Sequence, residues 1–128
     1  MSRKVIHSEQ APKAIGPYSQ AVSVPAGNLV FLSGQIPLDP TTGELVVGDA
    51  AAQTEQVMKN LSAVLGAAGV GFGQVVRCGI FLTDLADFGK VNEVYGRYFP
   101  AAPPARVTVQ VAALPRGARV EIDAIAVG

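Results

Sequence analysis

Residues 104–127, PARVTVQVAALPRGARVEIDAIAV, contain two runs of alternating side chains that decide the predicted fold. Valines alternate with polar residues in the first run, and aliphatic residues alternate with charged ones in the second, as expected of β-strands. The short link between them, Leu-Pro-Arg-Gly, predicts that the two strands pair. In that pairing Arg106 and Glu121 share one face of the sheet, with Thr108 between them.

Arg106 and Glu121 have side chains that suit chemistry on a small acid. An arginine presents a planar fork that holds a carboxylate through two parallel hydrogen bonds. A neighbouring glutamate can order a water molecule or accept its proton. A solvated outer face of an antiparallel sheet explains such polar residues equally well, and more often, so the pair alone does not decide between a site and a surface.

The composition indicates one domain, residues 1–128, because 128 residues provide too little material for two cores. Hydrophobic residues make up 49% and charged residues 16%, which predicts surface buried by self-association. Ten basic and ten acidic residues balance, so nucleic acid is not an expected partner. Without an apolar leader or a bilayer-length segment, we expect a cytoplasmic protein with no membrane partner.

Metal and thiol chemistry are not expected within one chain. The sequence has a single cysteine, Cys78, and a single histidine, His7, which makes a zinc site or a Cys/His catalytic pair improbable. Cys78 lies in the apolar run VVRCGIFL, where a small buried hydrophobic side chain is the favoured interpretation. The sequence contains no phosphate-binding loop, and the glycines of residues 66–73 are too scattered for a dinucleotide fingerprint.

Hydrophobic periodicity predicts two helices. The first covers residues 50–68, with its apolar residues on one stripe and Asp49 as N-cap. The second begins near Asp87 and is stopped by Pro100.

The predicted strands are residues 4–7, 20–24, 28–35 and 75–82, followed by the two C-terminal runs. We expect residues 20–24 and 28–35 to form a hairpin around a Pro-Ala-Gly-Asn turn. This order predicts an α+β fold, in which two helices cover one face of a sheet of about six strands. The other face would present aliphatic residues around Arg106 and Glu121 and would favour a partner subunit. Association would partly bury the charges of Arg106 and Glu121. Because buried charges are retained when they are paired or take part in function, this burial favours a pocket at a subunit boundary.

Four short motifs occur in order along the chain. From the N-terminus they are AIGPYSQA at 14–21, SGQIP at 33–37, Asp87-Phe88 with Val91-Asn92, and a C-terminal motif. The C-terminal motif begins with PARVTV at 104–109 and continues through 112–114 to VEI at 120–122. Together they resemble the RidA family of reactive intermediate deaminases. One such motif would be a weak signal, but four in the right order and spacing identify the chain as a member.

The resemblance implies a chorismate-mutase-like fold with a mixed sheet, and a homotrimer with a central barrel and clefts between subunits. It implies hydrolysis of small 2-imino acids, such as 2-iminobutanoate and 2-iminopropanoate released by pyridoxal-phosphate enzymes, to 2-oxo acids and ammonia. No metal or organic cofactor is implied. Arg106 would hold the substrate carboxylate, and Glu121 would orient or deprotonate the attacking water. The cleft would be lined by Tyr18, Ser33, Gly34, Asn92 and Thr108.

Each lining residue also has a structural explanation when it is taken singly. Tyr18 could anchor a loop, Ser33 and Gly34 could mark a strand end, and Asn92 could be an exposed helix residue. Glu121 could be an ion-pair partner at an interface. Only their joint occurrence with Arg106 favours a site.

Three functions therefore stay open. The first is an imine deaminase, and the second is a trimeric binding module that senses a 2-oxo or 2-amino acid through Arg106 without turnover. The third is an endoribonuclease or translation inhibitor, against which the balanced charge counts.

Thr108 stands where many family members carry a cysteine. Modification of a thiol at that position is therefore excluded, and the identity of the preferred imine stays open.

Overall fold

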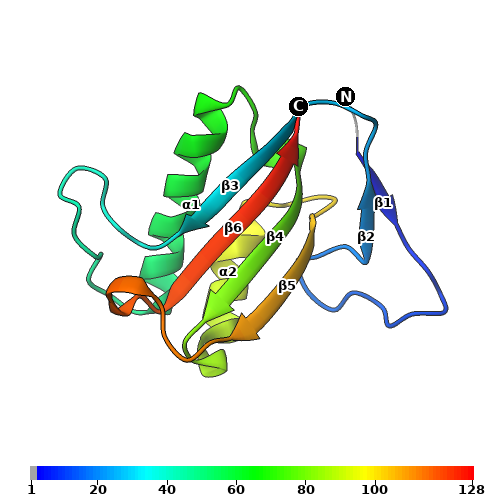
Figure 1. The fold of residues 1–128 in the computed structure, drawn as a ribbon. Coiled ribbons are helices and arrows are strands. Elements are labelled where there is room, and N and C mark those ends of the chain that lie inside the picture. The colour runs from blue at the N-terminus through cyan, green and yellow to red at the C-terminus, as the bar shows by residue number, and fades with distance from the viewer. Residues whose placement is uncertain (1–2) are drawn as a thin grey trace.

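Two α-helices and six strands make up the protein in the computed structural model, which describes residues 3–128 (Figure 1). The strands are β1 (Lys4–Ile6), β2 (Ala21–Ser23), β3 (Leu29–Gln35), β4 (Val75–Leu82), β5 (Ala105–Gln110) and β6 (Val120–Val127). The helices are α1 (Ala50–Ala67) and α2 (Phe88–Arg97). The predicted α+β class is confirmed.

Four strands form the main sheet in the order β3-β6-β4-β5, and both helices lie on one face of it (Figure 1). β6 runs antiparallel to its neighbours β3 and β4, whereas β4 and β5 are parallel. Parallel strands need a long crossover, and the segment containing α2 provides it. The position of α2 is thereby fixed against β4 and β5.

The predicted pairing of the two C-terminal strands is wrong, because β4 lies between β5 and β6. The link that joins them contains a 3₁₀ turn at Pro115–Gly117 and is not a tight hairpin turn. Backbone hydrogen bonds hold each end of the link at the end of β4. At its start Val111 N donates to Leu82 O at 2.8 Å, and at its end Arg119 O accepts from Thr83 N, the residue after β4, at 3.2 Å. The link therefore steps across the width of a strand.

The predicted hairpin of residues 20–24 and 28–35 is also wrong. β2 pairs with β1 in a separate two-stranded sheet, which stands beside β5 and away from β3 (Figure 1). β3 pairs with β6, and Asn28 and Gly128 extend that ladder through two backbone hydrogen bonds of 3.0 Å each. The eight residues of β6 give β3 a longer ladder than the three residues of β2 could, which explains the exchange of partner.

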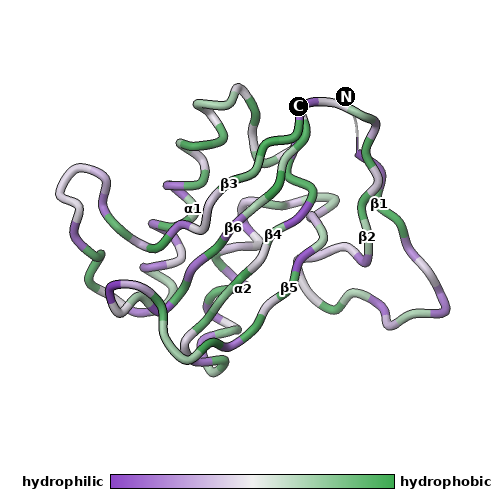
Figure 2. The backbone as a smooth tube through the Cα atoms, viewed as in Figure 1, coloured by the Kyte–Doolittle hydropathy of each residue, from purple (hydrophilic) through white to green (hydrophobic). Residues whose placement is uncertain are grey.

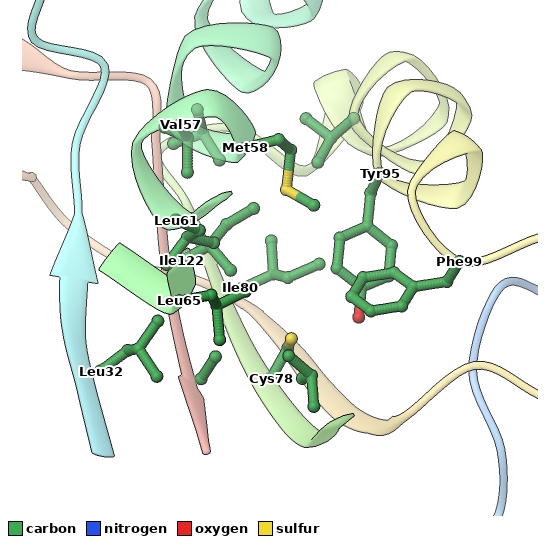
Figure 3. Close-up of a cluster of buried hydrophobic side chains, with 14 of the residues drawn as sticks. Leu32, Val57, Met58, Leu61, Leu65, Cys78, Ile80, Tyr95, Phe99 and Ile122 are labelled. Carbon is green, nitrogen blue, oxygen red and sulfur yellow. The ribbon is translucent and has the colours of Figure 1, made fainter. Parts of the chain in front are cut away.

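The core lies between the main sheet and the helices, as the apolar stripe of the first helix predicted. Figure 3 shows α1 side chains facing side chains of β4 and β6, and all of them are at most 1% exposed: Val57, Met58, Leu61, Leu65, Cys78, Ile80 and Ile122. Asp49 caps α1 as predicted, because its side chain accepts a hydrogen bond from Ala52 N at 3.0 Å. The placement of Cys78 in the core is confirmed.

The opposite face of the main sheet is uncovered in the single chain. Leu29 and Phe31 of β3 are 62% and 71% exposed there, and Val107 and Val109 of β5 are more than a third exposed. Apolar residues recur along the strands of this sheet (Figure 2). An apolar face of this kind is typical of surfaces that another subunit covers. Within residues 3–128, neither helix has the length and apolarity that crossing a bilayer requires.

Candidate active site

Arg106 faces the helices and not the open face of the sheet. In the β4–β5 register it lies opposite Cys78, a core residue on the helix-covered side. Glu121 lies opposite Phe81, an odd number of residues further along β4, so it points to the open face. The predicted common face for Arg106 and Glu121 is therefore wrong, because β4 separates the two strands and sets the register of each independently.

Helix α2 supplies most of the surroundings of Arg106. Asn92 Oδ1 accepts a hydrogen bond from Arg106 Nη1 at 2.6 Å. Arg106 Cζ lies 5.5 Å from the ring centroid of Phe88 and 5.3 Å from the ring centroid of Tyr95. Phe88, Asn92 and Tyr95 follow one another at spacings of four and three, which places them on one side of the helix.

Tyr18 completes the surroundings of the guanidinium from the N-terminal segment. Its ring centroid lies 5.3 Å from Arg106 Cζ. Ser19 anchors this segment beside β5, because its backbone N donates to Pro104 O at 3.2 Å and its hydroxyl donates to Pro103 O. Three aromatic rings thus surround one guanidinium, an arrangement that holds a cation in a fixed orientation.

Gly16 keeps one edge of the guanidinium accessible. A Cβ at this position would lie 3.3 Å from Arg106 Nη2, which is tight for a carbon atom, and 3.7 Å from Asn92 Nδ2, which is an ordinary contact. The absence of a side chain at residue 16 therefore leaves space beside Nη2 that a ligand oxygen could occupy.

Burial lowers the pKa of the Arg106 guanidinium, and the neighbouring Tyr95, Tyr18 and Cys78 partly oppose that shift. An arginine stays protonated in proteins despite such shifts. Among residues 3–128, Asn92 is the partner that accepts a hydrogen bond from this side chain, although a guanidinium carries five N–H donors. A half-buried cation with free donors is suited to bind a carboxylate in two-pronged fashion.

Two hollows flank Arg106 and share Tyr18, Phe88 and Arg106 itself as walls. One has a volume of about 330 Å³ and extends toward Val107 and Thr108. The other has a volume of about 220 Å³ and is also lined by Ile15, Gly16 and Asn92. Arg106 therefore stands at the boundary between the two hollows.

Thr108 lines the larger hollow and has a buried hydroxyl. Its Oγ1 is buried and has no hydrogen-bond partner among the described residues. A buried hydroxyl without a partner costs roughly 1–3 kcal/mol, so a ligand or water that bonds to it gains that amount. Thr108 lies two residues after Arg106 on the same side of β5, as the strand alternation predicted.

Glu121 meets Gly34 on the other side of the sheet. A Cβ at Gly34 would overlap the Glu121 carboxylate, with Cδ at 2.8 Å, so the glycine is what allows this close approach. The β3–β6 register is irregular between Leu32 and Gln35, which places Ser33 and Gly34 in a bulge beside Glu121. Ser33 and Gly34 are both exposed.

The seven predicted site residues therefore fall into two groups within one chain. The arginine group lies on the helix side of β5 and contains Tyr18, Asn92, Arg106 and Thr108. The carboxylate group lies beside the β3 bulge and contains Ser33, Gly34 and Glu121.

Phe88 and Tyr95 also belong to the arginine group, although the sequence did not predict them as site residues. Their spacing around Asn92 in the second predicted helix was the signal available, because it places all three on one side of that helix.

Among residues 3–128, no group of three or more His, Cys, Asp or Glu side chains is placed to hold a metal ion.

Comparison with known proteins identifies the family. Residues 8–128 match the model of the Endoribonuclease L-PSP family. Protein DfrA of Myxococcus xanthus is 73% identical over 127 residues, which cover 99% of this chain and 97% of that protein. The 2-iminobutanoate/2-iminopropanoate deaminase of Mus musculus is 54% identical over 125 residues, covering 98% of this chain and 91% of the mouse protein.

A solved structure gives the same result for the fold. The crystal structure of RidA from the Antarctic bacterium Psychrobacter sp. PAMC 21119 is similar with a TM-score of 0.77 and 46% identity, covering 98% of this chain and 99% of that one. The chain belongs to the Endoribonuclease L-PSP family, the family of the RidA proteins that its four motifs resemble.

Proposed function

We propose that this protein is an imine deaminase that hydrolyses small 2-imino acids, such as 2-iminobutanoate and 2-iminopropanoate, to 2-oxo acids and ammonia. The observation that carries the proposal is the Arg106 guanidinium, which is half-buried among three rings and has free N–H donors. The high identity to relatives named as deaminases of these compounds supports the same substrate class.

In the proposed complex, Arg106 binds the substrate carboxylate through two parallel hydrogen bonds. Asn92 holds Nη1 and thereby fixes the plane of the fork. The imine carbon is bonded to the carboxylate carbon, so orienting the carboxylate also orients the reacting centre. Such positioning contributes to rate because it replaces a random encounter with a fixed geometry.

Glu121 is the proposed base. Water adds to the imine carbon, and the electrons of the C=N bond move to nitrogen, which takes up a proton. Glu121 accepts one proton from the water and passes it to nitrogen, which gives a tetrahedral intermediate with a hydroxyl and an amino group. The hydroxyl then gives up its proton, which Glu121 transfers to the amino group, and its oxygen forms the C=O bond as the C–N bond breaks and ammonia leaves. One imino acid and one water thus give one 2-oxo acid and one ammonia. An iminium carbon is already electrophilic, so the reaction requires neither a metal nor an organic cofactor.

The proposed site forms between subunits. Arg106 and Glu121 point to opposite sides of the sheet, which supports a site in which the Glu121 of a neighbouring chain serves as the base beside Arg106. The exposed apolar residues of the open face, Phe31 among them, offer a surface on which chains can associate. We propose a homotrimer in which each cleft combines the arginine group of one subunit with the carboxylate group of the next.

The decisive experiment is a coupled assay in which a threonine dehydratase generates 2-iminobutanoate and 2-oxobutanoate formation is followed with and without the protein. We expect acceleration by the wild type and loss of most activity in Arg106→Lys, because an ammonium cannot make the two-pronged contact. Wild-type turnover by that variant would contradict the role of Arg106. No acceleration together with saturable binding of 2-oxobutanoate would indicate the binding module instead. RNA cleavage that survives Arg106→Ala would indicate the ribonuclease.

A mixing experiment tests the shared site. Arg106→Ala and Glu121→Ala chains are each expected to be inactive alone. Co-refolding them produces mixed oligomers in which some clefts contain an intact arginine group and an intact carboxylate group. Recovery of part of the wild-type activity supports a site between subunits, whereas no recovery, with mixed oligomers confirmed by mass, would place both residues in the same site of one chain.

A further inference from the structure

Ile15 is one of the most exposed large apolar side chains of the chain, at 90%. It lies in the N-terminal segment that carries Gly16 and Tyr18 to Arg106, and it forms the outer wall of the smaller hollow. The fold gains almost nothing from this side chain, because it is not packed against the core. An isoleucine held at the mouth of a charged site calls for a different explanation.

The smaller hollow has two distinct sides. Ile15 and the ring of Phe88 provide an apolar side, and Asn92 and Arg106 provide the polar side. Its volume of about 220 Å³ is below the roughly 300–1,000 Å³ typical of pockets for drug-sized ligands. Such a space accommodates a short aliphatic group.

The larger hollow differs in polarity at its far end. Thr108 lines that end, and its hydroxyl lies beneath the wall without a partner among the described residues, where it can accept a hydrogen bond from an N–H group that reaches it. A 2-imino acid bound by its carboxylate at Arg106 has an N–H group and an aliphatic tail on opposite sides of its reacting carbon. The two ends of the molecule therefore match the two hollows on either side of Arg106.

We propose that Ile15 and Phe88 form a subsite for the aliphatic tail of the substrate and that Ile15 sets the preferred tail length. This inference rests on the proposed function, since it places the tail relative to a carboxylate held by Arg106. Tails of two or three carbons reach Ile15, whereas the single methyl group of 2-iminopropanoate contacts Phe88 and leaves Ile15 largely uncovered. Ile15 is then a specificity-determining residue that does not take part in the chemistry.

The test uses a homologous series of imines made by an amino-acid oxidase from alanine, 2-aminobutanoate, norvaline and norleucine. Imine hydrolysis is followed by the loss of trapping with semicarbazide, and kcat/KM is determined for each member. In Ile15→Ala we expect the ratio of kcat/KM for the norvaline-derived imine to that for the alanine-derived imine to fall about tenfold. One or two methylene contacts in an apolar pocket discriminate by roughly 10–200-fold, and an exposed site lies at the low end.

Val47→Ala is the matched control, because Val47 is 96% exposed and lines neither hollow. We expect its ratio to equal that of the wild type. An unchanged ratio in Ile15→Ala, or an equal fall for every member of the series, would overturn the tail subsite.

Binding measurements separate failure of this inference from failure of the proposed function. If the wild type accelerates none of the imines, the deaminase proposal is lost. The subsite is then tested by calorimetric titration of 2-oxo acids with three to six carbons. Affinity that rises with tail length in the wild type and not in Ile15→Ala supports the subsite, and a length dependence that is the same in both chains contradicts it.

Discussion

Asn92 Oδ1 accepts a hydrogen bond from Arg106 Nη1 at 2.6 Å, and this is how helix α2 orients the guanidinium at the edge of the sheet. A neutral acceptor fixes the plane of the fork without neutralising its charge. The cation thus stays available to an anionic ligand. The choice of an amide at residue 92 follows from that requirement.

Replacing Asn92 tests this relationship. Asn92→Ala removes the acceptor, and a hydrogen bond to a charged group is worth roughly 1.5–3 kcal/mol, so we expect kcat/KM to fall by about ten- to a hundredfold. Asn92→Asp keeps the geometry and adds a negative charge that competes with the substrate carboxylate, so KM should rise further than in Asn92→Ala. Steady-state kinetics on 2-iminobutanoate measure both effects. A lower KM in the aspartate variant would contradict the proposed position of the carboxylate.

Gly34 is expected to control the position of Glu121. In Gly34→Ala the new methyl group overlaps the carboxylate, so Glu121 must move and kcat should fall about tenfold or more, with KM little changed. Gly73→Ala is the control, because a Cβ there meets nothing within 4 Å. Circular dichroism and kinetics on both variants separate a local displacement from unfolding, and equal activity of the two variants would contradict the prediction.

Tyr95 contributes through its ring and not through its hydroxyl. The hydroxyl is buried beside the Cys78 thiol, which is a weak hydrogen-bond partner, so we expect Tyr95→Phe to change the free energy of unfolding little. Tyr95→Leu removes a ring that lies against both Phe99 and Arg106 and should lower that free energy by about 2–4 kcal/mol. Urea titrations measure both values. A loss of stability in Tyr95→Phe comparable to that in Tyr95→Leu would contradict this assignment.

Cys78 predicts a pH dependence of stability. Burial raises the pKa of the Cys78 thiol to about 11, from an ordinary value of 9.0. The unfolded chain then loses the thiol proton at lower pH than the folded chain does, so this contribution is complete below about pH 9 and is lost as the pH rises toward 11. At 1.36 kcal/mol per pKa unit the loss amounts to about 2–3 kcal/mol.

Cys78→Ala isolates that contribution from the titration of other groups. Unfolding curves between pH 8 and pH 11, taken for the wild type and the variant, give the difference in slope. We expect the free energy of unfolding of the wild type to decrease more steeply with pH. Parallel curves would show that the thiol does not titrate differently in the folded state.

Phe31 tests the open face of the sheet. Its side chain is 71% exposed in the single chain, so Phe31→Asp should leave the fold intact and weaken association between chains. We expect light scattering to show a smaller species and imine hydrolysis to fall with it. Val47→Asp, at a site 96% exposed in a loop, should change neither property. A variant of Phe31 that keeps both its oligomeric state and its activity would argue against this face as the interface.

Local sequence patterns predicted the helices and strands well, but they did not predict which strands pair with one another. Alternation around Val107 and Ile122 identified β5 and β6, and Asp49 identified the start of α1. Which strand lies beside which depends on contacts between distant segments, such as the parallel ladder that places Arg106 opposite Cys78. The sequence after Val111 predicts a turn between paired strands, but in the structure this link passes across the end of β4.

The sequence predicted several side chains that the structure brings together, but not how they are arranged. Tyr18, Asn92 and Arg106 do meet, although they come from a loop, a helix and a strand. Glu121 could not be placed by strand parity, because one intervening strand is enough to reverse the side to which it points. Phe88 and Tyr95 resemble ordinary core residues in a helical pattern, and only the position of the guanidinium reveals their second role.

The opposite orientations of Arg106 and Glu121 link the proposed catalysis to protein concentration. In the proposed homotrimer, a chain that leaves the assembly keeps Arg106 but has no Glu121 carboxylate beside that cation. Turnover per chain should therefore fall when the protein is diluted below the dissociation constant of the oligomer. In a cell that makes both intact and defective copies, mixed oligomers would form. A chain lacking one of the two residues would then inactivate only the clefts to which it contributes that residue.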